Sequence, residues 1–261
     1  MPPSSSPTSR LEAIALPGIP LVRPGDDLAA LIRDALIRAD LALAEGDVLV
    51  VAQKIVSKAE GRLVRLDTVR PSAEARRLAK RAGKDPRLVE IVLSESREVL
   101  RVRDNLIITR HRLGLVMANA GVDASNVEGA EEGVVLLLPE NPDASCARLG
   151  AALGPGCAQH IGVVINDSVG RAWRRGQIGT AIGCWGLGAL QDLRGRPDLF
   201  GRKLQVSEAA MADQLASLAA LLQGQADEGQ PVVLVRGGFA DPAAGGVAAD
   251  LIRPLEQDLF R

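Results

Sequence analysis

The sequence is poor in aromatic residues and carries almost no net charge. It has 261 residues, no tyrosine, three phenylalanines and two tryptophans. So few rings argue against a base-stacking surface for nucleic acid and against interfaces anchored by tyrosine. Lysine plus arginine total 31, and aspartate plus glutamate total 32. A net charge of −1 gives no bulk attraction to nucleic acid or to an anionic membrane.

Histidine, cysteine and long apolar runs are also scarce. Two histidines, His111 and His160, are thin material for a histidine-rich metal site or a Ser-His-Asp triad. The three cysteines are an odd number without CxxC spacing, which favours a reducing compartment. No run reaches the ~18 apolar residues that cross a bilayer, and the start lacks signal-peptide features. We therefore expect a cytoplasmic protein whose residues 1–10 form a disordered tail.

Apolar residues make up 47% of the chain, enough for a sizeable core, and their spacing predicts alternating helices and strands. The predicted helices are 26–44, 72–82, 86–93, 142–153 and 207–222, the last with Ser207 as a cap. The predicted strands are 47–56, two short strands within 106–119, then 134–139, 161–167 and 231–238. This order predicts a mixed α/β fold.

Polar side chains gather where four of the apolar runs end, as is usual for sites in α/β proteins. The four groups are Lys54, Ser57 and Lys58; Asn119, Asp123, Ser125 and Asn126; Asn166, Asp167, Ser168, Arg171, Arg174, Arg175 and Gln177; and Gln225, Asp227 and Glu228. The carboxylates and amides suit Mg²⁺ or Mn²⁺ better than zinc. The lysines and arginines suit phosphates. The residues alone thus predict a metal-dependent enzyme that acts on a phosphorylated ligand.

Simpler interpretations stand beside this one. Each aspartate alone is more often a turn or helix cap than a ligand. Arg174 and Arg175 are typical of a surface pair, whereas both tryptophans are typical of the core. His111 lies in a basic turn and is expected to be exposed. Neither a P-loop nor the Rossmann GxGxxG pattern is present, so the standard nucleotide-binding motifs do not apply.

Five longer stretches resemble a known family when read in order. They are LPGIP at 16–20, VVAQKIVSKAEGR at 50–62, ANAGVDASNV at 118–127, INDSVGRAWRRGQIGTAIG at 165–183 and DEGQPVVLVRGG at 227–238. Together they resemble the coenzyme F420:L-glutamate ligase (F420-0 gamma-glutamyl ligase) family over about residues 11–240. The resemblance implies a ligase domain at 11–243, a C-terminal extension at 244–261 and the stand-alone form without a nitroreductase-like domain. It also implies an intertwined homodimer with a mixed α/β fold.

The resemblance further implies a reaction and its cofactors. The family joins L-glutamate to a deazaflavin precursor with GTP, and can extend a gamma-linked polyglutamate tail. It requires Mg²⁺ or Mn²⁺, with two ions expected, and K⁺ is often stimulatory. The implied metal ligands are Asp123, Asp167, Ser168 and Gln225. The implied nucleotide-binding residues are Leu16, Pro17, Gly18, Ile19, Lys54, Ser57, Lys58, Asn126, Gln223, Gly224, Gln225, Ala226, Asp227, Glu228, Gly229 and Gln230.

Two further side chains are given reaction roles under this reading. Lys58 is expected to offset the repulsion between the triphosphate and the acceptor carboxylate. Arg174, or its neighbours Arg171 and Arg175, is expected to receive a carboxylate of glutamate or the phosphodiester of the precursor. The number of glutamates added stays open, as does the acid that the precursor carries.

Two alternatives remain. One is a related amide-forming ligase with another carboxylate acceptor, such as a folate. The other is a non-catalytic nucleotide-binding homologue, which predicts that ligand residues have been lost. Asp123, Asn126, Asp167 and Gln225 are all present, which disfavours the second alternative.

Overall fold

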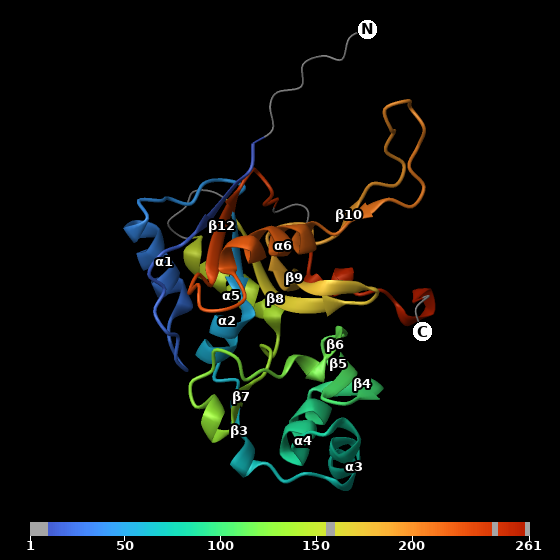
Figure 1. Ribbon diagram of the computed structural model, residues 1–261. Coiled ribbons are helices and arrows are strands. Elements are labelled where there is room, and N and C mark those ends of the chain that lie inside the picture. The colour runs from blue at the N-terminus through green and yellow to red at the C-terminus, as the bar shows by residue number, and fades with distance from the viewer. Residues whose placement is uncertain (1–9, 155–159, 242–244, 259–261) are drawn as a thin grey trace.

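A five-stranded sheet forms the centre of the molecule (Figure 1). The computed structural model describes residues 10–154, 160–241 and 245–258. In spatial order the strands are β1 (Glu12–Ala15), β12 (Val232–Arg236), β2 (Val48–Ala52), β8 (Gly162–Arg171) and β9 (Arg174–Trp185). Only β2 and β8 pair in parallel, with Ala52 opposite Asn166; the other neighbours are antiparallel. The predicted mixed α/β class is confirmed.

Helices cover both faces of this sheet, which explains why its central strands read as unbroken apolar runs. One face carries α1 (Leu28–Arg38), α2 (Gln53–Ala59) and α5 (Pro142–Leu153), and the other carries α6 (Met211–Gln223). Alternate residues of β2 serve the two faces: Leu49 and Val51 pack with the first group, whereas Val48 and Val50 pack on the α6 side.

A smaller lobe holds α3 (Ala73–Ala82), α4 (Pro86–Ser94), β4 (Ser96–Arg103), β5 (Leu106–His111) and β6 (Val116–Ala118). It lies below the main sheet in Figure 1 and has its own apolar core, which includes Leu78, Val89 and Ile107. A short sheet of β3 (Leu63–Arg65) and β7 (Val134–Leu136) lies beside the lobe, below the main sheet in Figure 1.

Two peripheral parts complete the fold. β10 (Gln191–Asp192) and β11 (Glu208–Ala209) form the base of an arm that projects away from the main sheet (Figure 1). The segment after β12 returns to the body, where Ala248 is buried and its N–H donates to Asp143. Short 3-10 helices lie at Leu66–Thr68, Asn119–Gly121, Ala130–Glu132, Ala248–Leu251 and Leu255–Gln257. Of the helices that the structure describes, none has the length and apolar character needed to cross a bilayer.

Several predicted elements are confirmed with small changes. Ser72 caps α3 and Gly83 ends it in the left-handed region, as the sequence indicated. The helices predicted at 86–93 and 142–153 are α4 and α5, capped by Asp85 and Asn141. The tail predicted at 1–10 lies outside the described residues, except for Arg10. Cys157 also lies outside them.

Other predictions need correction. The predicted strand 47–56 ends at Ala52, and the chain then turns into α2, whose Ile55 and Val56 are buried. The helix predicted at 26–44 ends at Arg38, because Asp40 has a φ of 53°. The helix predicted at 207–222 starts only at Met211, since β11 occupies residues 208–209. Strands β1, β3, β4, β9, β10 and β11 were not predicted.

The predicted exposure of two single residues is also wrong. His111 was expected to be exposed but is fully buried, because it continues the inward-facing alternation of β5. Trp173 was expected in the core but is 86% exposed, because it lies in the two-residue loop between β8 and β9. The other tryptophan, Trp185, packs against the core as expected.

Candidate active site at the ends of two parallel strands

The candidate site lies at the edge of the main sheet where β2 ends and its parallel pairing with β8 stops. The chain leaves β2 into α2, so Lys54 and Lys58 lie one helical turn apart beyond this edge. β8 brings Asp167 and Ser168 to the same edge, directly after Asn166. The ends of parallel strands are the usual position for ligands in open α/β sheets.

The loop after β6 reaches this edge from the small lobe. Its Asp123 forms an ion pair with Lys54, and the Lys54 ammonium group also lies 3.1 Å from the Ser125 hydroxyl. The Ser125 N–H donates to Asp123 at 2.8 Å. Backbone hydrogen bonds between Asp123 and Leu136 fix the loop to β7. Two segments that are 69 residues apart in sequence are thereby joined by charge.

Asp123 lies close enough to Asp167 to affect its ionisation. Burial raises the pKa of Asp167 to about 6, and the charge of Asp123 adds to this rise, while the Ser168 N–H and Lys54 oppose it. Burial also acts to raise the pKa of Asp123, but Lys54 and Ser125 outweigh it and lower that pKa. Lys54 therefore acts on both carboxylates, as the ion-pair partner of Asp123 and as a nearby charge that opposes the rise in the pKa of Asp167.

The loop after α6 closes the other side of the site. The Gln225 amide donates to the Ser168 hydroxyl at 2.8 Å. The Asn126 amide donates to the carbonyl of Ala226 at 3.0 Å, and the Lys58 ammonium group donates to the carbonyl of Asn126 at 2.6 Å. Burial lowers the pKa of Lys58, and the charge of Lys54 acts in the same direction against Glu128. Residues from four separate segments thus meet at one edge.

The shape of this last loop is set by local contacts. Gly224 has a φ of 71°, and a Cβ there would lie 1.9 Å from the Glu228 carboxyl carbon, so only glycine fits. The Glu228 carboxylate in turn accepts from the Ala226 N–H at 2.8 Å. Gln223 faces inward and accepts from Asn166 at 2.7 Å, whereas residues 225–230 are exposed. The exposed ones include Asp227, Gly229 and Gln230.

The LPGIP stretch begins at the same edge. The Leu16 N–H donates to the carbonyl of Val232, which pairs with Val51 near the end of β2. Leu16 is buried, whereas Pro17 and Gly18 are exposed and Ile19 is partly buried. The carbonyl of Gly18 accepts from Arg38 at 2.9 Å, which fixes the loop against α1.

Two other predicted residues are placed away from this exposed edge. Ser57 is fully buried and donates to Gln53 at 2.9 Å within α2. Arg174 lies at the tip of the β8–β9 hairpin, exposed and beyond the cluster around Asp167. One contributor was missed: Gln53, 3% exposed, lies near Asp167 and acts to lower its pKa. Its only sequence signal was its position next to Lys54.

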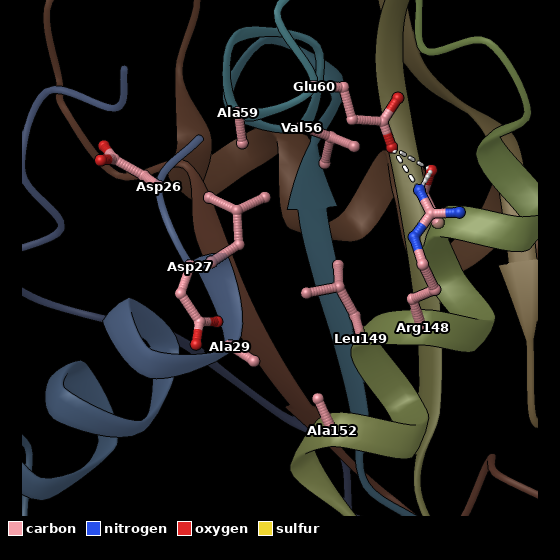
Figure 2. Close-up of a pocket in the computed structure, with 11 residues that line it drawn as sticks. Asp26, Asp27, Ala29, Val56, Ala59, Glu60, Arg148, Leu149 and Ala152 are labelled. Atoms are coloured by element: carbon pink, nitrogen blue, oxygen red, sulfur yellow. Dashed lines mark hydrogen bonds and ion pairs between the residues drawn. The ribbon is translucent and has the colours of Figure 1, made fainter. Parts of the chain in front are cut away.

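A separate cavity of about 260 Å³ lies between α1, α2 and α5 (Figure 2). It is lined by Val56, Ala59 and Glu60, on another side of α2 from the two lysines. Glu60 accepts from Arg148 at 2.6 Å and from Ser145, so its carboxylate is already bound by protein groups. The polar groups of Glu60, Arg148 and Ser145 in this cavity therefore bind one another, and the cavity is distinct from the candidate site.

Comparison with known proteins decides the family. The family model described as F420-0:Gamma-glutamyl ligase matches residues 18–237. The chain belongs to this family. It is 46% identical over 261 residues to the coenzyme F420:L-glutamate ligase of Methanopyrus kandleri, covering 98% of each chain. It is 43% identical over 252 residues to the ligase of the same name from Methanothermobacter thermautotrophicus, covering 96% of this chain and 99% of the relative. The resemblance drawn from the five sequence stretches is confirmed.

The donor atoms of this F420-0:gamma-glutamyl ligase family member fit a divalent cation. Asp123 and Asp167 supply carboxylate oxygens, and Ser168 and Gln225 add a hydroxyl and an amide oxygen. In the described part of the chain, no three histidine, cysteine or acidic side chains converge as a metal cage. Mg²⁺ commonly binds through one or two carboxylates and completes its shell with water and substrate phosphates. The site suits that mode of binding.

Proposed function

We propose that this chain uses GTP to join L-glutamate to the deazaflavin precursor of coenzyme F420. The main support for this proposal is that Lys54, Asp123, Asp167 and Gln225 lie together at one edge of the sheet. The chain is also a member of the F420-0:gamma-glutamyl ligase family. Paired carboxylates beside ammonium groups suit a triphosphate with its cation. The names of the curated relatives supply the two substrates joined.

The chemistry requires that the acceptor carboxylate be activated, because oxide is too poor a leaving group. A carboxylate oxygen of the precursor attacks the γ-phosphorus of GTP, and GDP leaves with the electrons of the broken P–O bond. The amine of glutamate then attacks the acyl carbon, loses a proton and displaces phosphate. The products are an amide, GDP and phosphate. In such transfers the protein mainly positions the reactants and neutralises charge.

Charge neutralisation is the larger task, since two anions must meet. At 4 Å, two unit charges repel by about 4 kcal/mol at an effective dielectric constant of 20. Asp123 and Asp167 would hold one divalent cation, and Ser168 with Gln225 would help to hold a second. When bound, such a cation withdraws charge from the phosphoryl oxygens. Lys58, which is half-buried and donates to the Asn126 carbonyl, would donate to a phosphate oxygen as well.

The remaining details follow the family resemblance. Mg²⁺ and Mn²⁺ both match the oxygen donors, and K⁺ stimulates the reaction. Repeated addition builds a gamma-linked polyglutamate tail. The working form is a homodimer. Leu199 and Phe200, 99% and 96% exposed at the end of the β10–β11 arm, support this, because large apolar side chains at such a position favour a second copy as partner. Light scattering gives the mass in solution.

The test is mass spectrometry of the product formed from GTP, L-glutamate and the precursor. We expect the precursor to gain one glutamate residue or more, with GDP and phosphate released in equal amounts. EDTA should abolish product formation, and added Mg²⁺ or Mn²⁺ should restore it. A folate offered as acceptor is the control for a different ligase. Glutamylated folate without glutamylated precursor would overturn the substrate assignment, and full activity in EDTA would overturn the metal-assisted route.

A further inference from the structure

The hairpin formed by β8 and β9 ends in an exposed aromatic side chain. Both strands run on together beyond the rest of the sheet (Figure 1). Arg171 is the last residue of β8 and Arg174 the first of β9, so Ala172 and Trp173 form a two-residue loop. Trp173 is 86% exposed. Its φ of 64° lies in the left-handed region, where glycine or asparagine is usual and a bulky residue is an outlier.

The charges around this loop oppose folding. Arg171 and Arg174 face each other across the hairpin, and like charges directly opposite destabilise a strand pair. Arg175 follows immediately. Within the described residues, none of the three arginines forms an ion pair. The Arg171 guanidinium group makes one long hydrogen bond, to the Arg175 carbonyl at 3.5 Å. A ring and three uncompensated cations at a strained turn are a local conflict of the kind found at functional sites.

The strand β8 links this loop directly to the candidate active site. Asp167 and Ser168 lie only four and three residues before Arg171 on the same strand. At about 3.4 Å per residue, Arg171 and its partner Arg174 lie roughly 14 Å along the strand from Asp167, and the Trp173 backbone, one residue further out, lies roughly 17 Å from it. The order along the hairpin is therefore reaction centre, cations, then ring.

This order matches the acceptor in the proposed function, on which the inference rests. The precursor carries its reacting carboxylate at one end, a phosphodiester in the middle and a flat deazaflavin ring at the other end. We propose that the β8–β9 hairpin is the acceptor-binding element: Arg171, Arg174 and Arg175 bind the phosphodiester and Trp173 stacks on the ring. A guanidinium group is suited to phosphate and to aromatic faces, and an exposed indole supplies a stacking surface.

The test compares variants in precursor binding and turnover. We expect Trp173→Ala to raise the KM for the precursor about tenfold, the size of one lost aromatic stack, and to leave kcat and the KM for GTP within twofold. Trp173→Phe keeps a ring and should recover most of the affinity. Ile37→Ala, a change at a 75% exposed apolar side chain on α1, is the matched control and should leave every constant unchanged.

A shortened acceptor separates the two contacts. For the same phosphodiester acid without its ring, Trp173→Ala should have no effect, whereas Arg175→Gln should weaken both acceptors, by less at high salt. An unchanged KM in Trp173→Ala overturns the proposal. The proposal is also overturned if Trp173→Ala changes the mass measured by light scattering but not the affinity for the precursor, because the loop would then be an interface between copies.

Equilibrium dialysis with the precursor, without GTP, keeps this result separate from the proposed function. If the wild type forms no glutamylated product but retains the precursor, and Trp173→Ala does not, the ligase assignment fails and the hairpin assignment stands. If the wild type is active and both proteins retain the precursor equally, the hairpin assignment alone fails.

Discussion

Two charged clusters in this chain are built in opposite ways. In the first, Glu95 at the end of α4 is contacted by Arg62 and Arg112 at 3.0 Å each, with the His111 ring at 3.4 Å. Burial alone would raise the pKa of Glu95, but His111 and the two arginines lower it to about 2. One carboxylate is thus surrounded by more positive charge than is needed to neutralise it. The cluster links the small lobe to the main body.

The second cluster has the reverse balance. Lys54 pairs with Asp123, whereas burial and the neighbouring carboxylate raise the pKa of Asp167 to about 6. The protein therefore completes the first cluster with its own groups, whereas in the second, within the described residues, Asp167 has no ion pair of its own. A cluster that is complete serves stability, whereas a cluster that lacks charge is suited to a ligand that supplies it.

The largest effect is expected from Asp167→Asn. The substitution keeps the shape of the side chain but removes one of the two carboxylates, so glutamate addition should fall at least ~100-fold. The urea midpoint should be no lower than that of the wild type, because a buried carboxylate beside another carboxylate does not favour the folded state. Turnover and urea unfolding check the two halves. Activity within a few-fold of the wild type would remove Asp167 from the metal site.

The opposite result is expected for Glu95→Gln. It leaves two arginines without their carboxylate, and we expect a loss of about 3 kcal/mol in the free energy of unfolding at pH 7, at roughly 1.4 kcal/mol per unit of pKa. The catalytic constants of the folded variant should change little, because Glu95 touches none of the site residues. Urea unfolding gives the first quantity. A stable but inactive variant would contradict the division between the two clusters.

The wild type and Glu95→Gln can also be compared as a function of pH, and the direction in which their stability difference changes can be predicted. The pKa of Glu95 is lower in the folded state than its ordinary value of 4.5, so its contribution to stability is complete above pH 4.5. It is lost as the pH falls from 4.5 towards 2. The difference in unfolding free energy between wild type and Glu95→Gln should therefore shrink over this range. A difference that stays constant from pH 7 to pH 3 would show that packing, not charge, accounts for it.

The two clusters also differ in how far the sequence predicts them. Asp123, Asn126, Asp167 and Gln225 were predicted to share a site, because each follows an apolar run and strand ends meet at a sheet edge. Glu95 gave no such signal. Its partners come from two separate segments, one with Arg62 and one with His111 and Arg112, and His111 was even assigned to the surface. A pairing of this kind depends on the packing of the small lobe, which local spacing does not encode.

Strand β9 shows a second reason why sequence reasoning failed. Its glycines lower strand propensity, so the stretch was not predicted as a strand. The structure explains two of them by close packing. A Cβ at Gly179 would lie 2.2 Å from the Ala216 carbonyl on α6, and one at Gly183 would lie 2.7 Å from the Pro142 backbone on α5. Without β9 there is no hairpin, and Trp173 is then assigned to the core by default.

The smallest effect is expected at the exposed pair of Asp192 and Arg194, which separates charge from burial. Hydrogen bonds from Arg194 lower the pKa of Asp192 to about 2, the same value as for Glu95. Asp192 is exposed, however, and solvent screens such a pair, so the pKa alone overstates its worth. Asp192→Asn should leave the urea midpoint unchanged at 0.15 M salt, where Glu95→Gln lowers it clearly. Equal shifts in the two variants would mean that the arm, and not only the Glu95 cluster, contributes to the stability of the main body.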